Sequence, residues 1–519
     1  MCLQSRLLAG VLALGGLVIG AGCEQAKQGE EGSGQRSEGP QEPDLALPDL
    51  RRVPDRPDLS KIVPWKAVNL LGPTDRVWEE YDYRPRAEGG LREEIDERLR
   101  QLKRLGVRQV QVQTMFSFCV ESTPYPGTSI RSTVYYNPRY RPDDPRTWGR
   151  VPRNRRGDMG AIAYQPPASW DVPTPLRGPL EINAKAEAVL GEMLEAVAAH
   201  GLVPVLKGEI YLTLAEDGSR SGVSPWFIFT DPSRNFDQFY RMYQEHLVAM
   251  TRVAARHRAA MHILGTELPY VAGAGQSYFA DGSRMVDRHE MIAAKWREII
   301  RAVRQAALEE GRPDLVISYT EINPFWEDRR MTAARVPVWT RVPFWDELDA
   351  VGINFYLPGR WSDGRGNYDT SPKTAADMVR YGETHNFATD FVPNMADIRE
   401  FFHVQRGYTL ETKPVFFAED GCTSSRAAAA NPAAPPFLRL GEQPDFAEQQ
   451  NLYEAHFVLF ERYGKGWLAG LGFWQVTPSL RWGGPWNAAD PSNYATPAAY
   501  FSFLGTPTEE TVRRGFSRY

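Results

Sequence analysis

Eight short apolar runs, separated by amphipathic helical patterns, constrain the fold of this 519-residue chain more than any other feature. The runs cover residues 67–71, 107–113, 202–207, 261–266, 315–319, 350–355, 414–418 and 468–475. Most of them are nearly continuous rather than alternating, as expected for parallel strands that are covered on both faces. Eight strand–helix units that close on themselves predict an α/β fold, a (β/α)8 TIM barrel.

The helical patterns lie between these runs. They cover residues 91–105, 184–200, 236–256, 289–310, 395–405 and 446–463, with a short turn at 344–348 before the sixth strand. Four of them end at or just before Gly106, Gly201, Gly311 and Gly464. Glycine commonly ends a helix because it adopts a left-handed backbone without steric cost. The order strand, helix, strand is therefore supported at the C-terminal ends of these four helices.

The first residues predict an export signal. Arg6 precedes an uncharged apolar run, 7–22, that is too short to cross a membrane comfortably. The run ends in Gly20-Ala21-Gly22-Cys23, which resembles a bacterial lipoprotein signal, in which Cys23 would be lipidated. The alternative is an ordinary secretory peptide cut near Ala21. We expect an exported lipoprotein of the bacterial cell envelope, at the outer membrane or the periplasmic face, or a secreted protein if Cys23 is not acylated.

The chain therefore divides into a signal at 1–22, a tether at 23–60 and a barrel domain at 61–519. The tether is rich in Gly, Glu, Pro and Gln and contains no aromatic residue, so it predicts disorder. The domain carries a long insertion after the second strand, 118–180, which is dense in Pro and Arg. We interpret it as a rim subdomain at the barrel mouth or as a solvated addition. Its arginines at 146–156 would meet an acidic substrate or simply be solvated.

Composition excludes several classes of function. A net charge of -5 offers no basic excess for nucleic acid. Four Cys do not support a disulfide scaffold or a multi-Cys zinc module, and eight scattered His show no paired spacing. We expect no metal, no cofactor and a monomer. Cys119 and Cys422 either pair or, as we favour, remain two buried thiols.

Polar and aromatic residues gather where the predicted strands end. The C-terminal ends of barrel strands carry the chemistry in this fold. The residues there are Lys207, Glu209, Glu267, Glu321, Asn354, Tyr356, Glu419, Asp420, Trp474 and Gln475. Several carboxylates among aromatic rings suit glycoside hydrolysis, in which one carboxylic acid protonates the leaving oxygen and a second carboxylate attacks or activates water. Aromatic faces stack on sugar rings.

Each acid also has a structural interpretation. Glu267 and Glu419 end otherwise apolar segments, HILGTELPYV and KPVFFAEDGC, which favours a site over a solvated helix cap. For Glu321 and Glu209, substrate contact and a structural role remain equally open. Asp420 is expected to cap or orient rather than to react.

Three segments, HILGTELP, VPFWDELDAVGINFYLP and KPVFFAEDGC, resemble clan A glycoside hydrolases. The most similar family is glycoside hydrolase family 113, the β-mannanase family, and the similarity covers roughly residues 64–486. The third-strand pair Leu206-Lys207 and the later Trp226 fit the same order. The resemblance implies a retaining mechanism with Glu267 as general acid/base and Glu419 as nucleophile. Tyr356 would hydrogen-bond the nucleophile, and Trp474 would form the floor beneath the sugar.

Other positions are less defined by the resemblance. Trp226, Trp326, Trp345 and Trp482 are candidate sugar platforms or packing residues. Thr266 stands where many clan A enzymes have Asn, Asn354 stands where the family pattern has Asp, and Glu209 stands where we expect His. Glu321 and the insertion at 118–180 have no counterpart in the pattern. These departures lie around the expected substrate.

The most direct hypothesis is a retaining glycoside hydrolase that cuts a β-linked polysaccharide or oligosaccharide, with β-mannan as the first candidate. Its substrate-binding residues would include Tyr356, Trp474, Asn354, Lys207, Trp226, Glu321 and Trp482. The alternative is a non-catalytic glycan-binding lipoprotein on the same barrel. A serine or metal hydrolase is disfavoured because no GxSxG occurs and no His lies at the proposed strand ends.

Overall fold

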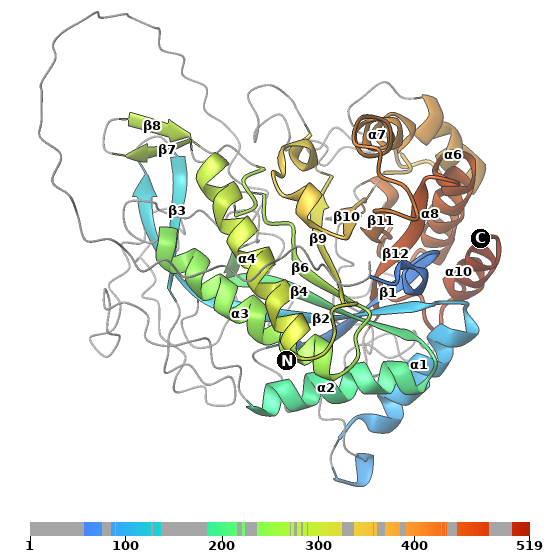
Figure 1. Ribbon diagram of the computed structural model, residues 1–519. Helices are drawn as coiled ribbons and strands as arrows, with labels where there is room; N and C mark the ends of the chain where they lie inside the picture. The colour runs from blue at the N-terminus through green and yellow to red at the C-terminus, as the bar shows by residue number, and fades with distance from the viewer. Residues whose placement is uncertain are drawn as a thin grey trace, which may run out of the picture.

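The structure is a computed structural model (Figure 1). It describes residues 57–74, 85–88, 90–125, 128–135, 184–214, 221–223, 236–269, 271–274, 278–281, 284–287, 289–323, 337–356, 358–360, 369–384, 391–426, 428–430, 432, 444–476 and 501–519. The proposed signal and lipidation site, most of the proposed tether and residues 136–180 of the insertion lie outside these ranges.

Eight parallel strands form a closed barrel. In barrel order they are β1 (Trp65–Thr74), β2 (Gln109–Tyr125), β4 (Val203–Leu214), β6 (Met261–Thr266), β9 (Val316–Ile322), β10 (Ala350–Asn354), β11 (Val415–Glu419) and β12 (Leu468–Val476). The pairing of β12 with β1 and of β2 with β4 closes the ring. This confirms the predicted TIM barrel. Each predicted strand overlaps an observed one.

Helices surround the barrel (Figure 1). They are α1 (Arg92–Arg104), α2 (Ala184–Ala199), α3 (Phe236–Arg256), α4 (His289–Glu309), α6 (Ala375–Thr384), α7 (Phe391–Ile398), α8 (Phe446–Leu459) and α10 (Thr508–Ser517). The π-helices η11 (Arg399–Gln405) and η13 (Phe460–Gly464) continue α7 and α8. Short 3-10 helices are η3 (Leu59–Lys61), η5 (Arg86–Glu88), η9 (Val338–Arg341), η10 (Trp345–Glu347) and η12 (Ala428–Ala430). None of the described helices is long and apolar enough to cross a membrane.

Shorter strands extend the rim. β3 (Thr128–Tyr135) pairs antiparallel with the far end of β2, so the insertion after the second strand begins as a hairpin. β5 (Ser221–Val223) pairs with β4, and β7 (Tyr278–Asp281) pairs with β8 (Arg284–Asp287). β2 and β4 thus run well beyond the apolar runs that predicted them. Their extra length pairs with each other and with the rim strands, a partnership that a single segment does not reveal.

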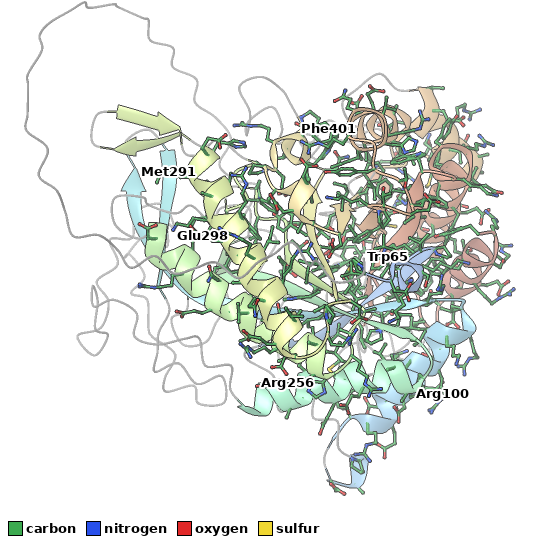
Figure 2. The ribbon with its side chains drawn as sticks, in the orientation of Figure 1. Trp65, Arg100, Arg256, Met291, Glu298 and Phe401 are labelled. Carbon is green, nitrogen blue, oxygen red and sulfur yellow. The ribbon has the colours of Figure 1, made fainter. Side chains whose placement is uncertain are left out.

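Two hydrophobic layers hold the barrel together. The inner layer fills one end of the barrel and includes Trp65, Val205, Met261 and Phe416. The outer layer packs the strands against the helices and is much larger. Figure 2 shows Trp65 among closely packed side chains, whereas Arg100 lies on the outer helix α1. A fully buried aliphatic or aromatic side chain contributes about 1.5–3 kcal/mol, so both layers fix the strand ends that carry polar groups.

Candidate active site

Three strands lose their regular register just before they reach the barrel mouth. β6 has one more residue than β9 between Ile263 and Thr266, and β11 has one more than β10 between Phe417 and Glu419. β12 has an extra residue relative to β1 after Phe473, where the Trp474–Gln475 peptide bond is cis. An extra residue reverses which face a side chain points to. These irregularities set the direction of the residues that follow.

Glu267 follows β6 in a left-handed conformation with φ of 55°. Its backbone N–H donates to the Thr320 carbonyl on β9 at 3.1 Å, which ties this conformation to the neighbouring strand. The side-chain amide of Asn354 donates to Glu267 Oε1 at 2.8 Å and to Thr266 Oγ1 at 3.0 Å. The carboxyl of Glu267 is therefore held from β10, two strands away around the ring.

Glu419 ends β11 and is held through both oxygens. The Lys207 ammonium on β4 donates to Oε1, and the Tyr356 hydroxyl donates to Oε2 at 2.8 Å. Lys207 is fully buried and Glu419 is 5% exposed. Two charged or polar donors from different parts of the chain thus fix the position of both oxygens of this carboxylate.

Burial raises the pKa of Tyr356 well above its usual value, and the nearby charges of Glu419 and Glu267 raise it further. The hydroxyl thus keeps its proton and remains a donor to Glu419 throughout the pH range in which enzymes usually work. Both acids act on this one hydroxyl, which shows that they share a single site.

β10 links the two acids. Asn354 lies beside Glu419 in the sheet register, while its side chain reaches Glu267. The Phe355 N–H donates to the Glu419 carbonyl at 2.7 Å, and Tyr356 then reaches the Glu419 carboxylate. The predicted residues Glu267, Glu419, Asn354, Tyr356 and Lys207 therefore come together in one place. The acid-bearing strands β6 and β11 are three steps apart around the ring, not directly opposite.

Trp474 lies beside this group. Its ring is partly exposed, and the Lys207 ammonium sits 5.5 Å from the ring centroid. The backbone N–H of Trp474 donates to the backbone carbonyl of Asp420 at 2.9 Å, so the residue after Glu419 also holds the backbone of Trp474 in place. A partly exposed indole beside buried charges is suited to stack on the apolar face of a sugar.

Asp420 follows Glu419 and contacts helix α8. Its carboxylate is fully buried and lies 2.7 Å from His456 Nδ1 on α8, and it accepts the Gly421 N–H at 2.7 Å. Gly421 has φ of 120°, and a Cβ there would approach the Tyr453 hydroxyl to 2.7 Å. Only glycine fits this turn without displacement. These contacts fix the position of Asp420 at the end of β11, and its expected role in capping or orienting stays a prediction.

Buried amides line the barrel below the acids, and sequence reasoning missed them. Gln111 on β2 donates to the Ala418 carbonyl at 2.8 Å, and Gln113 donates to Glu209. Asn69 on β1 donates to the Ala418 and Phe473 carbonyls at 3.1 and 3.2 Å. The signal was present as the alternation Gln109, Gln111, Gln113 in an otherwise apolar strand. A period of two places all three on the inner face.

Glu209 and Glu321 occupy different surroundings. Glu209 is 7% exposed, and its bond to Gln113 places it on the inner face, two residues beyond Lys207. Glu321 is fully buried and accepts the Tyr319 hydroxyl at 3.0 Å and the Ile322 N–H at 2.8 Å. Tyr319 packs against Trp296 of α4, so Glu321 shares the face that contacts the helices. That location favours a structural role for Glu321.

The remaining candidates lie elsewhere. Trp345 is fully buried, and its indole N–H donates to the Trp339 carbonyl at 2.7 Å, which makes it a packing residue. Cys422 is a free, buried thiol whose pKa burial raises. Trp226, Trp326, Trp482, Cys23 and the arginines at 146–156 lie outside the described residues. Across the described part of the chain, no group of three or more His, Cys, Asp or Glu is arranged to hold a metal ion.

Comparisons with known proteins point to one family. Residues 226–494 match the model of Glycoside Hydrolase Family 113. A search of curated protein sequences finds no match. The solved family 113 β-mannanase of Alicyclobacillus acidocaldarius shares 17% identity, with a TM-score of 0.48, over 88% of this chain and 97% of its own. A complex of a family 113 β-1,4-mannanase shares 14% identity, with a TM-score of 0.47, over 88% and 99%. A family 5 mannosidase from Rhizomucor miehei shares 13%, with a TM-score of 0.43, over 86% and 93%.

Proposed function

The chain belongs to glycoside hydrolase family 113, and from that premise we propose that it is a retaining enzyme that hydrolyses a β-linked polysaccharide or oligosaccharide. Glu419 is the nucleophile and Glu267 is the general acid/base. The sequence resemblance is to β-mannanases, so β-mannan is the substrate to test first.

The observation that carries this assignment is the unequal hydrogen bonding of the two acids. Glu419 accepts from the Lys207 ammonium and the Tyr356 hydroxyl, whereas the neutral amide of Asn354 donates to Glu267. A retaining enzyme needs one ionised carboxylate and one that carries a proton. A positively charged donor at Glu419 and an uncharged donor at Glu267 suit these two roles.

The chemistry follows in two steps. A Glu419 oxygen attacks the anomeric carbon, the bond to the glycosidic oxygen breaks, and that oxygen takes the proton from Glu267. Water then attacks the anomeric carbon, Glu267 takes a proton from the water, and the bond to Glu419 breaks. Trp474 supports the sugar beside Glu419, and Tyr356 holds Glu419 in place for the attack.

Covalent trapping tests the nucleophile. A 2-deoxy-2-fluoro-β-mannosyl fluoride should label the wild-type chain once, at the peptide that contains Glu419, as measured by mass spectrometry. The Glu419→Ala variant should remain unlabelled and inactive, and it should be less stable than the wild type because the buried Lys207 ammonium loses this partner. Glu298→Ala, at an exposed position on α4 (Figure 2), is the matched control and should label normally. A glycan-binding protein without turnover would show no label in any variant.

Leaving-group dependence tests the acid. Glu267→Ala should lose activity on β-mannan by about 100-fold or more, because general acid catalysis contributes roughly 100- to 10,000-fold. Its first step on 2,4-dinitrophenyl β-mannobioside should be nearly unchanged, since that leaving group departs without a proton. An equal loss on both substrates would contradict the role of Glu267.

A further inference from the structure

Lys207 reaches Glu419 across the barrel. β4 and β11 are four steps apart in the eight-membered ring, so they lie on opposite sides. The Lys207 side chain has no exposed surface. Its ammonium donates to Glu419 Oε1 and to Asn69 Oδ1 at 3.3 Å, and it lies 5.5 Å from the centroid of the Trp474 ring. A lysine is almost never buried so completely unless it is paired.

The charge of its partner changes during the proposed reaction. When Glu419 bonds to the sugar it becomes an uncharged ester, and the Lys207 ammonium loses this anionic partner. When the ester bond breaks, its electron pair returns to Glu419 and the ion pair forms again. Losing one partner of a buried pair costs several kcal/mol, whereas a carboxylate that leaves toward an ammonium is stabilised as its charge develops.

We propose that Lys207 is a catalytic residue for the second half of the reaction, in which it stabilises Glu419 as the departing carboxylate and so prevents the glycosyl-enzyme from accumulating. This rests on the proposed role of Glu419 as nucleophile. The same ammonium makes Glu419 a less reactive nucleophile in the first step. Lys207 therefore balances the two steps rather than favouring both.

A structural role would have a different signature. If Lys207 only filled the barrel or held Glu419 in position, its removal would slow formation and breakdown of the glycosyl-enzyme alike. The charge argument predicts that breakdown slows much more than formation. The ratio of the two rate constants therefore separates the two roles.

The experiment uses the full chain and 2-deoxy-2-fluoro-β-mannosyl fluoride. The rate constant of inactivation measures formation of the glycosyl-enzyme, and recovery of activity after the excess inhibitor is removed measures its breakdown. In Lys207→Met the ratio of breakdown to formation should fall by about tenfold or more, given the cost of an unpaired buried charge. An unchanged ratio would overturn the proposal.

Two further variants keep the result interpretable. Lys207→Gln is neutral but still polar, and it should lower the ratio in the same direction if Lys207→Met does not fold. Lys413→Met removes a largely buried lysine near the opposite end of β11, where it donates to the Trp345 carbonyl at 2.7 Å, and should leave the ratio unchanged. If the wild type itself is not labelled at Glu419, the proposed function fails, and this inference fails with it.

Discussion

Glu267 combines a proposed chemical role with a backbone conformation that side-chain-bearing residues rarely adopt. Its φ of 55° lies in the left-handed region, which costs an L-residue roughly 1–2 kcal/mol. The bond from its N–H to Thr320 and the bond from Asn354 to its carboxyl hold it there. Strain of this kind concentrates at functional sites, because the surrounding structure must impose the geometry.

This strain predicts a difference in stability between two variants that lack the proposed acid. Glu267→Ala and Glu267→Gly both lack the carboxyl, but glycine adopts the left-handed backbone freely, so Glu267→Gly should be the more stable by about 1 kcal/mol. Urea unfolding measures the difference. The same pair of substitutions at Thr266, where φ is not positive, should give the opposite order. Equal stabilities at Glu267 would show that its conformation is not strained.

At this scale the sequence predicted the two acids and, through the resemblance, the bond from Tyr356 to Glu419, but not Lys207 or Asn354 as their partners. Glu267 and Glu419 were predicted because each follows an apolar strand, and Tyr356 and Trp474 because of family resemblance. The contact between Lys207 and Glu419 joins residues 212 positions apart, and no local pattern indicates it. Asn69 and Gln111 hold the Ala418 carbonyl from other strands, which is equally invisible before the barrel closes.

The strands show what periodicity can and cannot reveal. β6 matches its predicted residues, 261–266, because a continuous apolar run ends where the polar mouth begins. The extra residues in β6, β11 and β12 have no signal in the sequence, since each is defined against a neighbouring strand. The direction of Glu419 follows from such an irregularity. The sequence therefore predicted that Glu419 lies at the C-terminal end of its strand, but not the direction in which its side chain points.

The turn after β11 predicts a further effect. In Gly421→Ala, the Cβ would meet the Tyr453 hydroxyl at 2.7 Å and the Trp474 carbonyl at 3.1 Å in a backbone with positive φ. We expect the free energy of unfolding to fall by about 1–3 kcal/mol. The value of kcat should also fall, because Glu419 and Trp474 flank this turn.

Gly311→Ala is the matched control for that variant. Gly311 has φ of 73° and an open position where the Cβ would stand, far along the chain from the acids. In Gly311→Ala, the free energy of unfolding should fall only by what a left-handed backbone costs alanine, and kcat should equal that of the wild type. If Gly421→Ala resembled Gly311→Ala in both stability and kcat, close packing at the turn would not matter for the site.

For the whole molecule, two buried histidines predict how stability depends on pH. Burial lowers the pKa of His246 on α3 and of His262 on β6 to about 3, from an ordinary 6.5. Between pH 6.5 and pH 3, these two histidines bind protons in the unfolded chain but remain neutral in the folded chain. The free energy of unfolding should therefore fall as the pH drops toward 3. Each histidine contributes up to about 1.4 kcal/mol per pH unit.

Unfolding in urea between pH 7.5 and pH 4 measures this dependence. A His246→Gln variant should show a shallower loss of stability with acid than the wild type, even if it is less stable at pH 7.5. His262 donates to or accepts from Thr251 at 3.0 Å, so a substitution of His262 would also break that bond. A slope unchanged in His246→Gln would mean that other groups control acid unfolding.

Attachment to a membrane also belongs to the scale of the whole molecule. We propose that Cys23 is lipidated, on the strength of the apolar run that precedes it and the polar tether that follows. Cys23→Ser should move the protein from the membrane fraction to the soluble fraction of a bacterial host, with unchanged activity per molecule. Retention of Cys23→Ser in the membrane fraction would count against lipidation.

The ion pair between Lys207 and Glu419 joins the two halves of the barrel. The first four strands of the barrel contribute Asn69, Lys207 and Glu267, and the last four contribute Tyr356, Glu419 and Trp474. Each half holds one of the two acids, and each half alone would bury a charge whose counterpart lies in the other half. The candidate active site thus lies at the boundary between two half-barrels. A change that moves the two half-barrels apart should abolish activity before either half-barrel unfolds.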